Sequence, residues 1–582
     1  MNIRATFKHE SYKHHYATHY VRIRDKEPYL DSIFDVYEAD MLCIKNDFVA
    51  CQLLLWSDSG YSVTLGENTY FSAKSVADNL RVCVSGIDMD YEFHHIGKVC
   101  DDDGSYKSDI LLNDETAEYA ANDIACVWLE FKTSAHELGT YNGTVKIFHH
   151  RILGDEVLLQ EMPFTVEVRG VELPNGNGKQ FHLDLWQHNS NIARKHEVRL
   201  WSDEHFDIME QYVSSLAELG QSAITVIASE IPWAGQLCFN DVRNISDLFE
   251  YSMARVYLED GEYEYDFSVI ERYIRMCMDY GITAEIEVFG LCNIWDGGAE
   301  YDCVPMGYPD LLRIRYYDRG EGVYKYINDK DGVCAYISAL ERFFGENGWL
   351  DAVRIVADEP HDVEQYRLSL NMIKTAAPKF KYKTAVGHAE FMTEFAQEID
   401  DFVPILSCAA EAEGSVKELA GDSRHRMLWY TCLMPPVPNT FVCSHLLEAR
   451  SIGWITAFMG FNGFLRWAYT AWPDKPRENP AYRAPEWRCG DVYFVYPASS
   501  GKPLLSLRYK ALQRGISDFE LIQMCKSAGY ADIVDRAYKS ILKFACMGDI
   551  LPLESKRAQE IISLESSTYD AARREMIQVL EQ

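Results

Sequence analysis

Two adjacent carboxylates, Asp358 and Glu359, stand where an apolar stretch ends. They follow Ile355-Val356-Ala357 and come directly before Pro360. An unpaired charge at the end of a buried strand is costly, and catalysis is one reason for a protein to keep it. Hydrolysis of a glycosidic bond needs an acid for the leaving oxygen and a second carboxylate for the developing positive charge. The alternative is a solvated turn before a helix capped by Asp362.

The adjacency of the two acids favours one form of this chemistry. Neighbouring side chains on a strand start from opposite faces, so they flank one anomeric carbon less simply than acids from two strands do. Adjacent acids fit better where the substrate supplies its own nucleophile. One acid then protonates the bridging oxygen, and the other orients and polarises a 2-acetamido group.

Eight short apolar runs alternate with helical segments in the middle of the chain. The expected strands are 181–187, 222–229, 282–289, 351–358, 381–387, 401–407, 427–433 and 463–469. The clearest helical segments between them are 203–219, 268–280, 335–345 and 362–376. This alternation predicts a TIM-type (β/α)8 barrel, whose active site lies at the carboxyl ends of the strands. A hairpin-like insert is expected at 253–267.

The regions on either side of the barrel have different patterns. Segments such as 127–132 and 145–148 alternate apolar and polar positions, and long helical periodicity is absent from residues 1–172, which predicts an N-terminal β-sandwich domain. The Gly- and Asn-rich segment 173–178 reads as a linker. We expect the catalytic barrel over 180–500 and a C-terminal helical region packed on it over 501–582. The predicted fold is therefore multidomain.

Side chains that suit a sugar gather at the expected strand ends. The apolar face of a sugar ring packs on indole, and its hydroxyls need amide or carboxylate partners. The candidate hydroxyl contacts are Asp184, Gln187 and Asn439, with Tyr430 for an acetamide carbonyl. The candidate aromatic walls are Trp186, Trp429, Trp467 and Trp472, while Trp233 and Trp295 follow the second and third strands. For each tryptophan, a place in the core is the alternative interpretation.

Composition excludes several classes of partner. The chain has 56 basic and 89 acidic residues, and its net charge of −33 disfavours nucleic acids and anionic membrane surfaces. The 16 cysteines show no metal-binding spacing, so we expect no metal, no cofactor, and reduced thiols in the cytoplasm. The first residues form no secretory signal, and no segment is suited to membrane insertion. A neutral saccharide remains a suitable partner.

Four segments together resemble one enzyme family. The run Val356-Ala357-Asp358-Glu359-Pro360 resembles the catalytic segment of the glycoside hydrolase family 123 β-N-acetylgalactosaminidases. The other matching segments are 184–187 with 201–206, 428–432 with Pro438-Asn439, and 506–508 with 515–520. They occur in order between about residue 180 and residue 522, which makes the resemblance far more specific than the acid pair alone.

The resemblance implies a retaining exo-hydrolase that releases terminal β-linked N-acetylgalactosamine from glycans, including glycosphingolipid oligosaccharides. It implies substrate-assisted catalysis through an oxazolinium intermediate. Asp358 would orient and stabilise the acetamide, and Glu359 would act first as general acid and then as general base. The preference for the galacto over the gluco configuration rests on the resemblance alone.

Three other functions stay open at this point. A β-N-acetylglucosaminidase would use the same acid pair. A two-carboxylate β-glycosidase would pair Glu359 with a distant acid, for which the candidates are Glu230, Glu285, Glu287 and Glu411. The third is a non-catalytic carbohydrate-binding protein on a degenerate barrel. The intact acid pair argues against the third.

Overall fold

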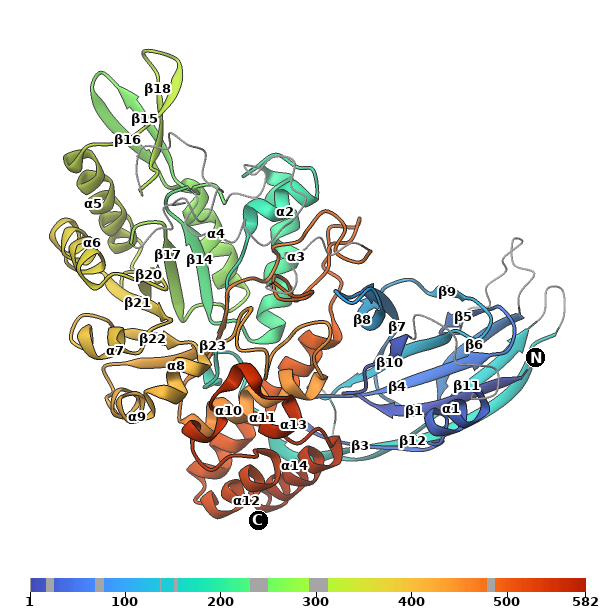
Figure 1. The fold of residues 1–582 in the computed structure, drawn as a ribbon. Helices are drawn as coiled ribbons and strands as arrows, with labels where there is room; N and C mark the ends of the chain where they lie inside the picture. Colours follow the sequence, from blue (N-terminus) through green and yellow to red (C-terminus); the bar gives the residue numbers. More distant parts are fainter. Residues whose placement is uncertain are drawn as a thin grey trace.

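The structure, a computed structural model, describes residues 2–16, 26–67, 78–134, 136, 138–150, 155–230, 250–292, 312–478 and 487–582. It shows a multidomain chain with a sheet-rich N-terminal region, a nearly closed parallel barrel and a large helical C-terminal part (Figure 1). In the described part of the chain, no helix is both long enough and apolar enough to cross a membrane.

The N-terminal region contains two six-stranded sheets. One has the order β1 (Ile3–His9), β4 (Phe48–Ser57), β10 (Ile124–Lys132), β7 (Tyr91–Cys100), β8 (Tyr106–Leu112) and β2 (His15–Tyr16). The other has the order β3 (Ala39–Lys45), β12 (Val157–Glu172), β11 (Gly139–His150), β6 (Asp78–Ser85), β5 (Tyr61–Leu65) and β9 (Thr116–Tyr119). Apolar side chains of both sheets form one cluster. The β pattern expected here is confirmed, whereas the short helix α1 (Lys26–Ile33) was not expected.

The barrel consists of eight parallel strands. Their order is β13 (His182–Leu185), β24 (Gly463–Arg466), β23 (Arg426–Tyr430), β22 (Asp401–Pro404), β21 (Lys381–Val386), β20 (Val353–Asp358), β17 (Glu285–Phe289) and β14 (Ala223–Ile227). A single bridge between Leu183 and Gln221 joins the two ends of this sheet. Each strand falls within or overlaps one of the eight apolar runs, so the expected strand count is confirmed.

Helices follow the strands and cover the outside of the barrel. They are α2 (Asn189–Lys195), α3 (Asp203–Leu219), α4 (Ser268–Asp279), α5 (Lys330–Glu346), α6 (Val363–Ala376), α7 (Glu390–Glu394), α8 (Leu406–Glu411), α9 (Glu413–Gly421) and α10 (Leu446–Met459). Several begin at a capping side chain that accepts a backbone N–H of the first turn. Asp362, for example, accepts the Gln365 N–H at 2.8 Å, so the helix cap named in the alternative interpretation of the acid pair is present.

Two hairpins extend the barrel at one end. The expected hairpin is present as β15 (Arg255–Glu259) and β16 (Glu262–Asp266). A second hairpin, β18 (Arg315–Asp318) and β19 (Val323–Tyr326), pairs with it to give a sheet of order β16-β15-β18-β19. This four-stranded sheet projects beyond the barrel (Figure 1). The second hairpin was not expected, because its residues lack the apolar alternation that identifies a strand.

The C-terminal part adds α11 (Leu507–Ser527), α12 (Ala531–Ile541), α13 (Ala558–Ile561) and α14 (Ser566–Leu580). Helices α10 and α11 pack closely because glycines meet where they cross. A Cβ on Gly453 would lie only 1.9 Å from the Gly515 carbonyl oxygen. A side chain at this crossing would force the two helices apart.

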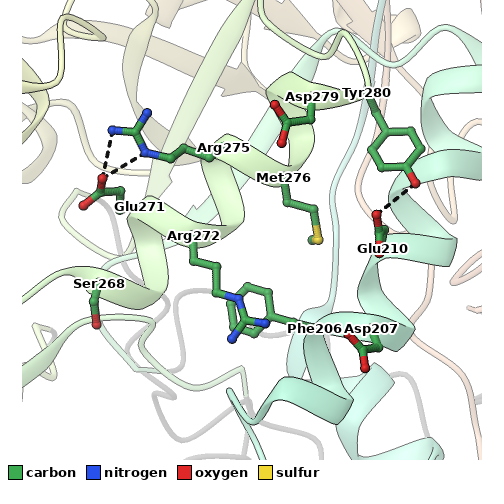
Figure 2. A pocket seen from close by; sticks show the side chains of 10 residues that line it. All are labelled: Phe206, Asp207, Glu210, Ser268, Glu271, Arg272, Arg275, Met276, Asp279 and Tyr280. Carbon is green, nitrogen blue, oxygen red and sulfur yellow. Dashed lines mark hydrogen bonds and ion pairs between the residues drawn. The ribbon is translucent and has the colours of Figure 1, made fainter.

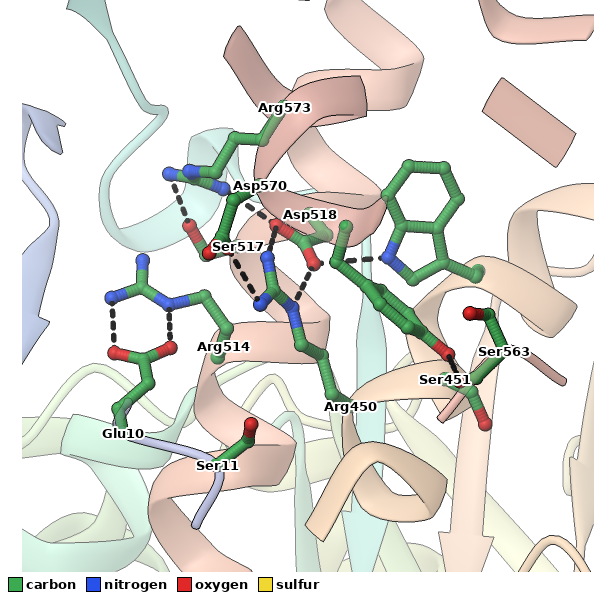
Figure 3. Close-up of polar contacts among 12 residues, drawn as sticks. Glu10, Ser11, Arg450, Ser451, Arg514, Ser517, Asp518, Ser563, Asp570 and Arg573 are labelled. Atoms are coloured by element: carbon green, nitrogen blue, oxygen red, sulfur yellow. Dashed lines mark hydrogen bonds and ion pairs between the residues drawn. The ribbon is translucent and has the colours of Figure 1, made fainter. Parts of the chain in front are cut away.

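A buried ion cluster joins these helices to the N-terminal region (Figure 3). Asp518 of α11 accepts from Arg450 of α10 and Arg573 of α14, each at 2.7 Å. Arg514 of α11 pairs with Glu10, which follows β1, at 2.7 Å. The segment 515–520, which carries part of the family resemblance, thus lies at the packing junction of the three parts of the chain.

Candidate active site

The acid pair lies at the carboxyl end of β20, where a barrel places its chemistry. Asp358 is the last residue of the strand and stands in register with Ala385 of β21. Alternation puts its side chain on the same face as that of Arg354, which donates to Asp401 at 2.7 Å. Asp358 is half-buried. Its carboxylate therefore lies on the inner face of the barrel, at the mouth.

Glu359 has a backbone conformation that few residues adopt. Its φ is +46°, in the left-handed region, and its N–H donates to the Ala385 carbonyl at 3.1 Å. This conformation costs a residue with a side chain roughly 1–2 kcal/mol, and such strain concentrates at functional sites. A regular strand would point Glu359 away from Asp358. The left-handed turn instead brings its carboxylate back over the mouth of the barrel.

Tyr430 completes a group of three at this mouth. It ends β23, two strands beyond β21 in the sheet, and its hydroxyl donates to Glu359 Oε1. The side chain is only 4% exposed. Burial, together with the neighbouring carboxylates of Glu359 and Asp358, raises the pKa of Tyr430 well above its ordinary value. The phenol therefore stays protonated and acts as a donor. The sequence predicted this residue as an acetamide contact, and the structure adds its contact with the acid.

A buried charge cluster fills the barrel beneath the mouth. Lys383 of β21 binds Asp184 of β13 and both Glu285 and Glu287 of β17. The ammonium nitrogen lies 2.9 Å from Glu285 Oε1 and 2.8 Å from Glu287 Oε1. All four side chains are fully buried. We call these four residues the Lys383 cluster. Asp184, expected to bind a sugar hydroxyl, belongs to it.

Burial and neighbouring charge act differently on the two glutamates. Burial alone would raise the pKa of Glu285, but Arg426 and Lys383 outweigh it and hold the pKa well below its usual range. Burial, reinforced by Asp184, raises the pKa of Glu287 well above its usual range. Glu287 therefore retains a proton more readily than its neighbours. Neither glutamate stands free as a second catalytic carboxylate.

Two of the predicted tryptophans lie near the mouth. Trp186 follows Asp184 by two positions, on the same face, and its buried ring lies 4.8 Å from that of Phe289. Trp467 directly follows β24 and is half-buried, edge-on to His188 at 5.9 Å. Trp186 thus lies beyond Asp184 on the same face of its strand, and Trp467 keeps exposed surface at a strand end.

The other two tryptophans predicted to line the sugar pocket, Trp429 and Trp472, are core residues. The buried indole of Trp429 donates to Thr456 Oγ1 of α10 at 2.7 Å. The buried indole of Trp472 donates to the Val495 carbonyl at 2.6 Å. A position near a strand end does not determine whether a side chain points into the barrel or toward the surrounding helices, and Trp429 points toward α10. Because both side chains are fully buried, neither lines a sugar pocket as predicted. Trp233 and Trp295 lie outside the described residues.

The two predicted amide contacts are satisfied by the protein itself. Gln187 accepts the Thr225 N–H at 2.8 Å and so ties β13 to β14. Asn439 is fully buried and donates to the carbonyls of Cys432 and Pro435 at 2.9 and 2.8 Å. The first amide stabilises the barrel wall, and the second fixes the loop after β23.

Glu230 connects the barrel to the four-stranded sheet. It follows β14 and is almost fully buried, and burial raises its pKa. Its Oε1 lies 3.0 Å from Arg315 Nε, and its Oε2 accepts the Tyr326 hydroxyl at 3.0 Å. Glu411, another acid considered above, is exposed at the end of α8. Neither Arg315 nor Lys383 was predicted from the sequence, although a lysine in the middle of an apolar strand is a usable signal of buried charge.

A hollow of about 470 Å³ lies elsewhere, between α3 and α4 on the outside of the barrel (Figure 2). Its polar side chains pair with one another, as Glu210 does with the Tyr280 hydroxyl at 3.1 Å. No reacting set is assembled there. Within the described ranges, no group of His, Cys, Asp and Glu is arranged to hold a metal ion.

Comparisons with known proteins match the part of the chain that contains the acid pair. A family model described as "Glycoside hydrolase 123, catalytic domain" matches residues 186–525, which include Asp358 and Glu359. The match extends past residue 500, the expected end of the barrel, to include most of α11.

Among solved structures, a family 123 glycoside hydrolase from Clostridium perfringens gives a TM-score of 0.74 at 17% identity and covers 100% of this chain and 99% of that chain. At this identity the likeness shows the fold. A putative glycoside hydrolase from Bacteroides vulgatus ATCC 8482 gives a TM-score of 0.30 at 9% identity, over 74% of this chain and 72% of that chain. The search of curated proteins gave no match.

Proposed function

The chain belongs to glycoside hydrolase family 123 and is a glycoside hydrolase, and we propose that it is a retaining exo-β-N-acetylgalactosaminidase that uses substrate-assisted catalysis. The observation that carries this proposal is the left-handed turn at Glu359, with which its carboxylate meets the Tyr430 hydroxyl at the barrel mouth where Asp358 ends its strand. Two acids side by side suit a substrate that provides its own nucleophile.

In the first step, the acetamido carbonyl oxygen of the substrate attacks C1 and forms a C–O bond. The glycosidic C1–O bond breaks, and its electron pair goes to the leaving oxygen, which takes the proton of Glu359. Asp358 accepts the acetamido N–H and stabilises the positive charge of the oxazolinium. Tyr430 holds the Glu359 carboxyl through the hydrogen bond described above.

In the second step, Glu359 takes a proton from water, and the water oxygen attacks C1. The oxazolinium ring opens to an N-acetylgalactosamine with its anomeric configuration retained, and Glu359 is again protonated. Two displacements at C1 give net retention. The acid and base roles thus alternate on one carboxyl group.

The state of the other acids argues against a two-carboxylate mechanism. Glu285 and Glu287 are bound to Lys383, Glu230 is paired with Arg315, and Glu411 is exposed on α8. A nucleophile or base in that mechanism needs a carboxylate that faces the anomeric carbon.

We extend the proposal to the natural substrate and to the parts of the chain. The Clostridium perfringens relative is described in terms of glycolipid glycan hydrolysis, and we propose glycosphingolipid oligosaccharides as substrates here. We interpret residues 1–172 as a β-sandwich domain, 180–500 as the barrel and 501–582 as the helical region. We also propose a reducing, cytoplasmic location, because all the cysteines described by the structure are free thiols.

The first experiment compares three chromogenic β-glycosides, of N-acetylgalactosamine, N-acetylglucosamine and galactose. We expect the acetamido sugars to be cleaved in preference to galactose, with the galacto configuration preferred. A thiazoline mimic of the oxazolinium should inhibit the enzyme competitively. Equal turnover of the galactoside, without thiazoline inhibition, would refute the substrate-assisted mechanism.

The second experiment tests the acid itself. Glu359→Gln should lower kcat on a substrate with a poor leaving group by roughly 10²–10⁴-fold, the usual contribution of a general acid. Glu364→Gln is the matched control, because Glu364 is exposed on α6 only a few residues away. Full activity of Glu359→Gln on the poor leaving group would rule out this role.

A further inference from the structure

The four-stranded sheet has one face packed against the barrel. Val256 of β15 and Tyr316 of β18 are buried, and their register places them on the same face. Tyr265 of β16 belongs to this face too, with its ring 5.6 Å from that of Tyr336 of α5. Among the residues that the structure describes, the opposite face of the sheet is the one with exposed side chains that could meet a ligand.

That opposite face carries a row of tyrosines. Strand register places Tyr257 beside Tyr317, and Tyr317 beside Tyr324. The rings of Tyr317 and Tyr324 lie 5.0 Å apart. Tyr324 is 66% exposed, an unusual position for a large aromatic ring. An exposed aromatic of this kind points to a binding surface.

The exposed ring is tied to the catalytic end of the barrel. The Arg315 guanidinium lies over the Tyr324 ring at 4.9 Å, and its Nε is 3.0 Å from Glu230, which follows β14. The Tyr326 hydroxyl donates to the same glutamate at 3.0 Å. Tyr324 is therefore held at a fixed place relative to a barrel strand end, and one ring face stays clear of the arginine.

The arginines on this face are paired with carboxylates. Arg315 is paired with Glu230, Arg319 with Glu264 at 2.9 Å, and Arg255 with Asp266 at 3.6 Å. A surface whose arginines are already paired has no charge to offer an anionic ligand. A neutral saccharide fits it better, because the C–H face of a sugar ring packs on an aromatic ring.

We propose that Tyr324, supported by Tyr317 and Arg315, forms an aglycone subsite that binds the sugars on the leaving-group side of the scissile bond. This inference rests on the proposed function, because it concerns the same substrate. The terminal sugar would occupy the mouth between Asp358 and Tyr430, and the rest of the glycan would cross the rim of the barrel onto the four-stranded sheet.

The experiment assays the full-length protein on two substrates. One is a neutral oligosaccharide with a terminal β-linked N-acetylgalactosamine, and the other is the corresponding β-azide, whose leaving group contains no ring. The measured quantity is the ratio of kcat/KM for the oligosaccharide to kcat/KM for the azide. Tyr324→Ala should lower this ratio about tenfold, as expected for the loss of one stacking contact.

Two controls make the comparison specific. Tyr324→Trp should keep the ratio near that of the parent, because stacking needs the ring and not the hydroxyl. Tyr106→Ala removes another exposed tyrosine, 42% exposed on β8 of the N-terminal region, and should leave the ratio unchanged. Circular dichroism checks that each variant is folded.

The outcomes separate the two proposals. If the parent cleaves both substrates and Tyr324→Ala leaves the ratio unchanged, the subsite is wrong and the proposed function stands. If the parent cleaves neither substrate, the proposed function fails, and with it the subsite. If the ratio of kcat/KM values falls tenfold in Tyr324→Ala and stays near that of the parent in Tyr324→Trp, both proposals are supported.

Discussion

The Lys383 cluster provides the sharpest test of how this barrel carries its site. Replacing Lys383 with methionine keeps most of the side-chain volume and removes the charge. Three buried carboxyl groups, those of Asp184, Glu285 and Glu287, then lose their shared cation. At about 3 Å and an effective dielectric constant near 20, each contact of the ammonium group with an ionised carboxylate contributes roughly 5–6 kcal/mol of attraction before desolvation is counted. Glu287 contributes less, because its raised pKa favours the neutral acid.

The expected loss of stability is smaller than this sum. The methionine variant no longer has to bury the ammonium group, and this offsets part of the lost attraction. Removing one partner of a buried ion pair typically lowers the free energy of unfolding by about 3–5 kcal/mol. We expect Lys383→Met to lie in this range near pH 8. The loss should be smaller near pH 5, because the stranded carboxylates can then take up protons.

A matched control lies two residues earlier on the same strand. Lys381 is 38% exposed and lies 3.4 Å from Asp351, which is fully exposed. Lys381→Met therefore removes only a surface ion pair, worth about 0–1 kcal/mol. Urea unfolding followed by tryptophan fluorescence would compare both variants with the parent. Adding Asp184→Asn to Lys383→Met should recover part of the loss, because it removes one uncompensated charge.

A Lys383→Met variant that is no less stable than Lys381→Met at pH 8 would contradict a stabilising role for the buried ammonium group. A loss of stability that does not diminish at pH 5 would also contradict it, because cavity formation and not charge would then determine the loss. Glu287→Gln gives a third comparison. Its raised pKa means that the folded protein favours the protonated acid, for which glutamine is a close neutral substitute. This variant should lose far less stability than Lys383→Met.

Two further predictions concern the mouth of the barrel and a buried glutamate. Tyr430→Phe removes the hydroxyl that donates to Glu359 and should lower kcat roughly tenfold. The control is Tyr469→Phe, which loses a buried contact with Ser215 and should leave kcat unchanged, because Tyr469 does not contact Glu359. Unchanged kcat in Tyr430→Phe would contradict the positioning role of Tyr430. Burial raises the pKa of Glu448 to about 7. The pKa of Glu448 in the folded state thus lies above its value in the unfolded state. The contribution of Glu448 to the free energy of unfolding is therefore complete below about pH 4.5 and is lost as the pH rises through about 7. As the pH rises from 5 to 8, Glu448→Gln should therefore gain stability relative to the parent, by on the order of 3 kcal/mol. Urea unfolding midpoints of both proteins at the two pH values measure this gain. A stability difference between variant and parent that is the same at both pH values would refute the raised pKa of Glu448.

The sequence predicted the strands because each is a short apolar run between polar segments. The run 351–358 becomes β20 (Val353–Asp358), and the hairpin expected at 253–267 becomes β15 and β16. The capping role of Asp362 followed from its residue type and its place before a helix. These features depend on local composition, which a single sequence displays directly.

Side-chain direction at the strand ends was much harder to predict. Trp429 and Tyr430 are neighbours on β23, yet Trp429 contacts Thr456 of α10 and Tyr430 contacts Glu359 at the mouth. Both were assigned to the sugar pocket because both lie near a strand end. Strict alternation along the strand separates them once the inward face is known, and that face depends on how the sheet curves.

The sequence by itself determined the alternating architecture and the position of the acid pair at the end of one strand. Both follow from local patterns of apolar and charged residues. Only the tertiary structure decided that Glu359 turns back toward Tyr430, and that Lys383 gathers Asp184 with Glu285 and Glu287. These groupings join strands far apart in the chain, and the register with which the parallel strands meet around the barrel fixes which side chains face one another.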